Sequence, residues 1–128
     1  MLPNRFLTPI LVATLAVASP AIAEGDAEKG GKVFKKCKAC HQVGDEAKNR
    51  VGPVLNGIVG APAGSIEDFK YSKVLIERAE EGLIWTEEEL AAFLAKPRSY
   101  MKGTKMSFAG LKKEQDQLDV IAYLKGFE

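Results

Sequence analysis

Three residues with reactive or metal-binding side chains lie within five consecutive positions: Cys37, Cys40 and His41. They are the only cysteines and the only histidine of the chain, and they form a C-x-x-C-H motif, the attachment signature of a c-type haem. In that chemistry each thiol adds to one vinyl group of the porphyrin, and the histidine places a neutral imidazole nitrogen on the iron. The motif predicts one covalently attached haem c, with His41 as an axial ligand.

Three other interpretations of the motif compete with haem attachment. A thioredoxin-like redox pair requires a βαβ pattern, and the sequence predicts no strand. A disulfide between Cys37 and Cys40 is compatible with export, but it closes so short a loop that it would stabilise the fold little. A solvated histidine without a role is ordinary for an isolated His, but not directly after C-x-x-C. Haem attachment is therefore favoured over all three.

The second axial ligand cannot be a histidine, because the chain has no other one. After residue 23 the chain has two methionines, Met101 and Met106, both in the segment 97–112. A thioether ligand raises the reduction potential of haem iron relative to imidazole. Buried methionines more often fill a core, but Met106 stands in a Gly-bounded segment with few other reasons for a methionine.

Residues 1–23 have the pattern of a secretory signal peptide. Arg5 gives a basic start, residues 6–22 carry no charge, and residues 21–23 (Ala-Ile-Ala) fit the small-x-small cleavage pattern. An uncleaved membrane anchor is the alternative, although an apolar stretch of about 17 residues is at the short limit for a span. We expect cleavage after residue 23, which leaves an exported chain of residues 24–128.

The overall composition is that of one ordinary globular domain. The chain has 128 residues, of which 46% are apolar and 27% charged, and its formal net charge is +1. The balanced charge argues against a dedicated nucleic-acid-binding protein, which would be strongly basic. Two cysteines and one histidine are too few for a structural zinc site.

The periodicity predicts an all-α chain with about four helices and two long loops. The helix signals, in chain order, are Asp26 as the N-cap of a helix to about Lys38, Ser72 as the cap of a short helix ending near Gly82, a Thr86-x-x-Glu89 capping box before a helix stopped by Pro97, and a last helix from about Lys113 to Lys125. Residues 44–65 and 97–112 are the loops, and their apolar side chains need something to pack against.

The chain resembles the class I c-type cytochromes, the family that includes mitochondrial cytochrome c and its small bacterial counterparts. The resemblance covers nearly all of residues 26–128, and its motifs follow the family's order. These motifs are Cys37-Lys38-Ala39-Cys40-His41, Val51-Gly52-Pro53, Phe69-Lys70-Tyr71, Trp85, the segment from Gly103 to Gly110 that contains Met106, and Ile121-Ala122-Tyr123-Leu124. The resemblance implies the cytochrome c fold, with long loops wrapped around one covalently bound haem.

The resemblance also implies roles for single residues. Met106 would be the axial ligand opposite His41, and the Pro53 carbonyl would accept a hydrogen bond from the His41 ring. Gly30 would permit close crossing of the first and last helices. Three further residues would approach the haem propionates: Tyr71, Trp85 and Thr104.

Three positions depart from the family's pattern. Lys102 precedes Gly103 where relatives often have proline, which restores backbone freedom to this loop. Ala61 stands where many relatives carry an arginine beside a propionate, and Phe93 stands where a tyrosine is common. We expect a looser Met106 loop and less compensation of the propionate charge.

The function implied by the resemblance is that of a soluble periplasmic one-electron carrier, not an enzyme. It would shuttle between a membrane cytochrome bc complex or a dehydrogenase and a terminal oxidase, a reductase or a photosynthetic reaction centre. Two protein ligands leave the iron no open position for a substrate. The alternatives are a peroxidase or gas-binding protein with a labile sixth ligand, and a non-haem module that uses the cysteines as a disulfide.

Charge is distributed unevenly along the chain. Residues 29–50 carry seven basic and two acidic side chains, residues 96–113 carry six basic and no acidic ones, and residues 65–89 carry three basic and eight acidic ones. We expect a positive face around the haem edge that steers a monomer into transient encounters with acidic surfaces of membrane redox complexes. The predicted docking residues are Lys35, Lys38, Lys102 and Lys105.

Overall fold

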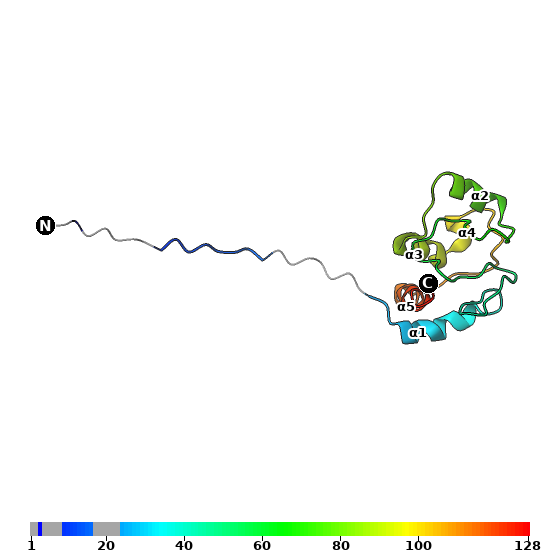
Figure 1. Cartoon of the computed structure of the whole chain (residues 1–128), viewed down its shortest axis with the longest axis horizontal. Coiled ribbons are helices and arrows are strands. Elements are labelled where there is room, and N and C mark those ends of the chain that lie inside the picture. The colour runs from blue at the N-terminus through cyan, green and yellow to red at the C-terminus, as the bar shows by residue number, and fades with distance from the viewer. Residues whose placement is uncertain (1–2, 4–8, 17–23) are drawn as a thin grey trace.

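The computed structural model describes Pro3, residues 9–16 and residues 24–128. Its helices are α1 (Ala27–Val33), the 3₁₀ turn η1 (Phe34–Lys36), α2 (Lys73–Glu80), α3 (Glu87–Ala95), α4 (Pro97–Tyr100) and α5 (Glu114–Leu124) (Figure 1). In these residues the only β pairing is one isolated antiparallel bridge between Pro62 and Ile84. The prediction of an all-α chain is confirmed, with five α-helices instead of about four.

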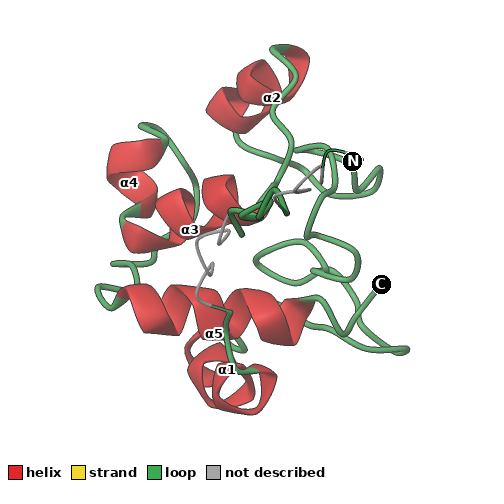
Figure 2. Cartoon of the chain, turned by 90° about the vertical axis from the view of Figure 1, so that its left-hand side faces the viewer, coloured by secondary structure: helices red, strands yellow, loops and turns green. Residues whose placement is uncertain are grey.

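The first and last helices cross in close contact. A Cβ placed on Gly30 of α1 would overlap the carbonyl oxygen of Asp119 and lie 2.8 Å from the Cβ of Tyr123, both on α5. Only glycine permits this separation of the two backbones. Phe34 is buried beside the crossing, and its ring centroid lies 5.3 Å from that of Tyr123. Figures 1 and 2 show α1 against α5 at one end of the domain and α2 at the other.

Side-chain caps begin three of the helices where the sequence predicts them. Asp26 accepts a hydrogen bond from the backbone N–H of Lys29, and Ser72 accepts one from Leu75. Thr86 accepts one from the backbone N–H of Glu89 at 3.2 Å. These bonds satisfy amide groups that the first turn of a helix otherwise leaves without a partner.

The capping box at α3 is only half formed. The Thr86 backbone N–H donates to the carbonyl of Ile84 at 2.8 Å instead of to the Glu89 side chain. The Glu89 carboxylate instead accepts a hydrogen bond from the hydroxyl of Tyr100. The Glu89 side chain therefore bonds Tyr100 of α4 instead of the backbone N–H of Thr86.

Two boundaries differ from the predicted ones. The first helix was expected to reach about Lys38, but its α-helical part ends at Val33 and tightens into η1, after which residues 37–40 form turns. The segment 97–112 was expected to be a loop throughout, but α4 begins it. Pro97 is the first residue of α4, where its fixed φ suits a helix and its missing N–H costs nothing, so the same residue ends α3 and starts α4.

One hydrophobic core fills the centre of the domain. Its buried members are Phe34, Ala63, Trp85, Leu90, Phe93, Leu94, Met101, Leu111, Val120, Ile121 and Leu124. The loop 44–65 contributes partly buried residues that pack against this core, among them Leu55, Ile58 and Val59. The loop is closed by Asn56, whose side-chain amide donates to the carbonyl of Gly44 and accepts from its N–H.

The proposed cleavage site lies outside the described residues. Residues 9–16, which the structure does describe, are exposed and form neither helix nor strand. No helix in the described part of the chain is long and apolar enough to cross a membrane.

Candidate haem-binding site

His41 is held in one orientation by the turn that follows it. The ring Nδ1 lies 2.8 Å from the carbonyl oxygen of Pro53, so Nδ1–H donates to it and Nε2 is left as the nitrogen with a free lone pair. The backbone of Gly52 packs directly against the ring. A Cβ at this position would overlap the ring Cε1 and lie 2.7 Å from both ring nitrogens. Burial lowers the pKa of His41, and the hydrogen bond to Pro53 partly opposes that effect. A lowered pKa keeps the imidazole neutral, which is the form that binds a metal.

The two cysteines are free thiols, although they are only three positions apart. The backbone carbonyl of Cys37 accepts hydrogen bonds from the N–H of Cys40 at 3.1 Å and from the N–H of His41 at 2.9 Å. This turn, which follows η1 directly, holds the backbones of all three motif residues close together. Burial raises the pKa of the Cys37 thiol, while nearby Lys36 acts in the opposite direction.

The two candidate methionines have different surroundings. Met101 has no exposed surface and belongs to the hydrophobic core. Met106 is partly exposed and lies at the margin of the same core, against which Cys37 also packs. The Met106 N–H donates to Thr104 Oγ1 at 3.2 Å. Met101 is thus surrounded by protein, whereas Met106 has surface left for another partner.

The three residues expected near the propionates are spread over different segments. The Tyr71 hydroxyl accepts a hydrogen bond from the backbone N–H of Ile66 at 3.0 Å, and burial raises its pKa. Trp85 is 4% exposed and pairs through its backbone with Ala61, whose carbonyl accepts the Trp85 N–H at 2.8 Å. The Thr104 hydroxyl accepts the backbone N–H of Met106. The structure therefore gives each of these residues a protein contact, which a structural role alone would also explain.

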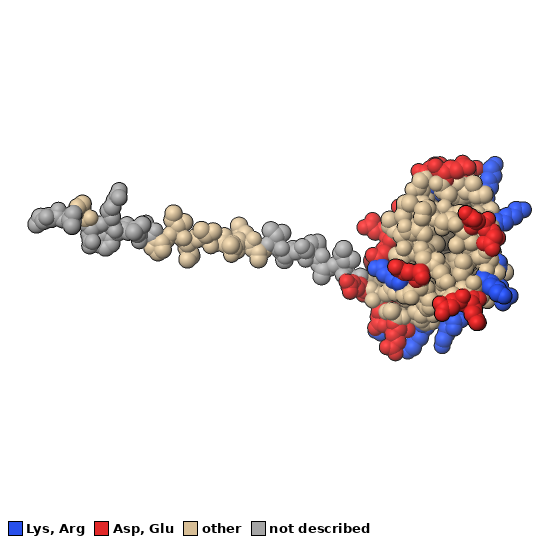
Figure 3. All heavy atoms as spheres, in the orientation of Figure 1, with Lys and Arg blue, Asp and Glu red and all other residues tan. Residues whose placement is uncertain are grey.

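Charged side chains of both signs lie on the surface of the domain. The four predicted docking residues, Lys35, Lys38, Lys102 and Lys105, are all exposed. On the face drawn in Figure 3, acidic side chains lie at the end of the domain that carries α2 and also at the opposite end, near α1. The segment 65–89, which contains α2, carries more acidic than basic residues.

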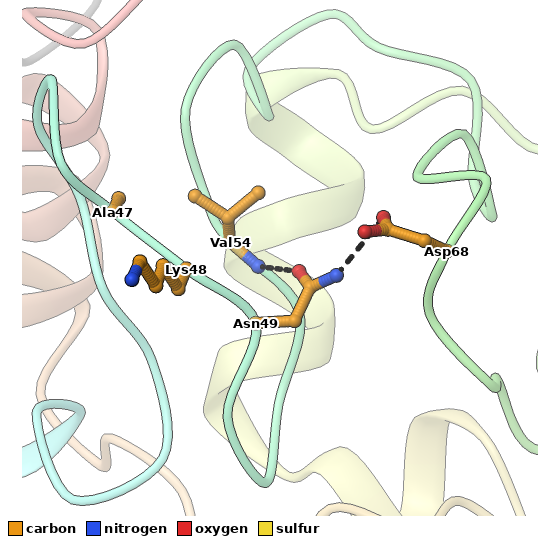
Figure 4. Close-up of a pocket in the computed structure, with 5 residues that line it drawn as sticks. All are labelled: Ala47, Lys48, Asn49, Val54 and Asp68. Atoms are coloured by element: carbon orange, nitrogen blue, oxygen red, sulfur yellow. Dashed lines mark hydrogen bonds between the residues drawn. The ribbon is translucent and has the colours of Figure 1, made fainter.

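Two surface hollows lie along the loop after the motif. One is lined by Gln42, Glu46, Lys48 and Arg50, and the other by Ala47, Lys48, Asn49, Val54 and Asp68. In the second, Asn49 accepts from the Val54 N–H and donates to the Asp68 carboxylate, so its polar groups are already paired (Figure 4). Neither hollow is lined by residues of the motif or by Met106.

Several residues that hold the fold together carried no local signal in the sequence. Asn56 closes the loop that presents Pro53, and Asp119 accepts the backbone N–H of Asp26 at 2.8 Å across the α1–α5 crossing. Tyr100 and Arg78 tie α2, α3 and α4 together. Their partners are 11 or more positions away, so only the folded chain reveals the contacts.

The donor groups fit haem c. Cys37 and Cys40 offer two thiols with no disulfide between them, and His41 offers an oriented neutral imidazole beside them. Met106 offers a thioether, and both Met106 and Cys37 pack against the same hydrophobic core. These are the residue types that attach and ligate the haem of c-type cytochromes.

Comparison with known proteins places these residues in a family. A family model described as cytochrome c matches residues 27–128. A cytochrome c2 from Afifella marina is 52% identical over 77% of this chain and 80% of its own, and a cytochrome c-550 from Ancylobacter novellus is 57% identical over 77% and 92%. The solved structure of cytochrome c2 from Rhodospirillum centenum is 43% identical, has a TM-score of 0.77, and matches over 80% of this chain and 98% of its own. The chain thus belongs to the cytochrome c family, as an electron carrier rather than an enzyme, with one covalently attached haem c.

Proposed function

We propose that this chain is a periplasmic one-electron carrier in which Cys37 and Cys40 would hold the haem and His41 and Met106 would ligate its iron. Residues 1–23 would be the cleaved signal peptide and residues 24–128 the cytochrome domain. When bound, the haem supplies a centre that cycles between Fe(III) and Fe(II). The observation that carries the assignment is the 2.8 Å hydrogen bond from His41 to Pro53, which orients a free imidazole nitrogen beside two free thiols.

The chain's own residues would keep the site rigid during electron transfer. Pro53 fixes the tautomer and the plane of the His41 ring, and Gly52 leaves room for that ring. The core around Phe34 and Met101 excludes water from one side of the motif. A dry surrounding disfavours the extra positive charge of the ferric state, so burial raises the reduction potential.

The remaining members of the site would serve the propionates. Tyr71 and Trp85 would donate hydrogen bonds to one of them, and Thr104 would lie near the other. The hydroxyl of Tyr71 supports this role, because in the structure it accepts one hydrogen bond and its own proton stays available for donation. Ala61 adds no charge where many relatives have an arginine.

The partners we propose are membrane redox complexes with acidic docking surfaces. The donor would be a cytochrome bc complex or a dehydrogenase, and the acceptor a terminal oxidase, a reductase or a photosynthetic reaction centre. Lys35, Lys38, Lys102 and Lys105 would form the contact surface, and their exposure supports this role. Such encounters are brief, and their interfaces are small.

Two measurements on the exported protein test the attachment and the localisation. The mass of the periplasmic protein should equal residues 24–128 plus one haem, and the haem should survive denaturation. The variant with both cysteines changed to alanine should carry none. A mass equal to the bare polypeptide would contradict covalent attachment, and a mass that includes residues 1–23 would indicate a retained anchor.

Two methionine variants test the axial ligand. Met106→His should lower the reduction potential, because imidazole stabilises Fe(III) relative to a thioether. Met101→Leu is the matched control, since it conserves volume in the core and should leave the potential unchanged. Carbon monoxide should bind the ferrous wild-type protein slowly, and rapid binding would favour a peroxidase or gas-binding protein with a labile sixth position.

A further inference from the structure

One face of α2 lies against the segment that leads to Met106. Val74 and Arg78 are four positions apart and therefore share a helix face. Val74 Cγ1 lies 3.7 Å from the place where a Cβ on Gly103 would sit. Arg78 Nη2 donates to the carbonyl oxygen of Tyr100 at 3.3 Å. The two contacts enclose residues 101–102 between them.

Tyr100 is held by two other helices at once. Its hydroxyl donates to the Glu89 carboxylate of α3, and its ring packs against Phe93 with the centroids 5.7 Å apart. The guanidinium carbon of Arg78 lies 5.9 Å from the centre of the same ring, within the range of a cation–π interaction. The end of α4 is therefore fixed by α2 and α3 rather than by its own four residues.

Backbone connections and hydrogen bonds link Tyr100 to Met106, the proposed iron ligand. The next residue, Met101, is completely buried, and its carbonyl accepts the Thr104 N–H at 3.1 Å. Thr104 Oγ1 in turn accepts the N–H of Met106 at 3.2 Å. A short series of contacts thus joins the Arg78 side chain to the backbone of Met106.

The segment itself has little stiffness. Lys102 is exposed, and Gly103 has a φ of +91°, so neither residue restricts the backbone as a proline would. The restraint must come from outside the segment, and the contacts of α2 supply it.

We infer that Arg78 and Tyr100 are positioning residues, through which α2 and α3 hold residues 100–106 so that the Met106 thioether stays on the iron against competing ligands. The inference rests on the proposed role of Met106 as a ligand. Arginine suits the task because its planar fork can donate to the Tyr100 carbonyl while it covers the ring. A lysine offers a point charge and cannot do both equally well.

The test is competition by free imidazole for the iron of the ferric holoprotein. Loss of the long-wavelength absorption band of thioether ligation and of the shifted methionine methyl resonance would report displacement. In Arg78→Gln the carbonyl loses a charged donor, so imidazole affinity should rise about tenfold. Tyr100→Phe keeps the carbonyl and the ring but loses the Glu89 bond, so the rise should be about threefold. Arg78→Lys should lie between Arg78→Gln and the wild type.

The control separates a local effect from general loss of stability. Asp119→Asn weakens the α1–α5 crossing, where Asp119 accepts from Asp26 and Gln115 and contacts no residue of the segment 100–106 by hydrogen bond. It should lower the resistance to urea and leave the imidazole affinity within twofold of the wild type.

Two results would overturn the inference, and a third would overturn the ligand assignment on which it rests. Imidazole affinity of Arg78→Gln within twofold of the wild type would show that Arg78 does not hold the loop. An equal rise in Asp119→Asn would show that any destabilisation releases the ligand. A wild-type protein without the thioether band and methyl resonance would instead contradict Met106 as the ligand, and the inference would fall with it.

Discussion

The carboxylate of Asp119 in α5 accepts the backbone N–H of Asp26 at 2.8 Å, although 93 positions separate the two residues. Asp26 is also the N-cap of α1, so one hydrogen bond ties the start of the first helix to the last helix. Gln115 donates a second hydrogen bond to the same oxygen at 2.8 Å. The α1–α5 crossing therefore depends on a charged group that is almost completely buried.

This charge makes stability dependent on pH. The N–H of Asp26 and then the Gln115 amide lower the pKa of Asp119 below its ordinary value. The stabilisation is therefore complete above about pH 4, the usual range of a carboxyl group, and is lost as the pH falls through the lowered folded-state pKa. Urea unfolding of the wild type and of Asp119→Asn should show a gap at neutral pH that closes towards about pH 2. A gap that stays constant over this range would contradict the assignment.

The helix crossing should tolerate no side chain at Gly30. In Gly30→Ala the new Cβ would overlap the Asp119 carbonyl, so the helices must separate, and we expect a loss of about 2 kcal/mol in the free energy of unfolding. Gly31→Ala is the matched control. Its Cβ would meet only the Tyr123 ring at 3.3 Å, and its effect should stay within about 0.5 kcal/mol. An equal loss of unfolding free energy in Gly30→Ala and Gly31→Ala would show that the close helix contact at Gly30 is not the cause.

The His41 ring should be displaced by a methyl group at Gly52. Gly52→Ala places a Cβ on the ring, so we expect a weaker hydrogen bond to Pro53, a shifted reduction potential and a loss of about 1–3 kcal/mol in stability. The neighbouring Val51 is 79% exposed, and Val51→Ala should change neither property measurably. Potentiometry and denaturant unfolding of both holoproteins check this, and an unchanged potential in Gly52→Ala would contradict it.

The two lysines beside Met106 should guide docking. Changing Lys102 and Lys105 together to glutamine should slow association with an acidic membrane oxidase several-fold at low salt, and the difference should vanish at about 1 M salt, where charges are screened within about 3 Å. The control variant changes Lys70 and Lys73, which are also exposed but lie in the acidic segment. It removes the same charge and should have a smaller effect in stopped-flow kinetics. Equal slowing would indicate that net charge alone matters.

The sequence was sufficient for features that depend on near neighbours. Asp26, Ser72 and Thr86 cap their helices as predicted because each bonds an amide three positions away. The C-x-x-C-H motif is equally local, and it determined the cofactor.

Other features depend on contacts between distant segments, which no short pattern encodes. Glu89 was predicted to close a capping box, but Tyr100 competes for its carboxylate once α3 and α4 have packed. Helix α4 itself was missed because Pro97 signals both an end and a start. The contact of Arg78 with Tyr100 exists only because the fold brings one end of α2 near the end of α4, and helix periodicity does not determine that placement.

The crossing of α1 and α5 also constrains the order of assembly. The partner of α1 is α5, residues 114–124, which are synthesised well after α1, so α1 has no surface to dock against until they emerge. Cys37 and Cys40 lie just beyond α1 and stay on an unanchored stretch until then. During this interval both thiols are accessible for haem attachment, before α1 packs against α5.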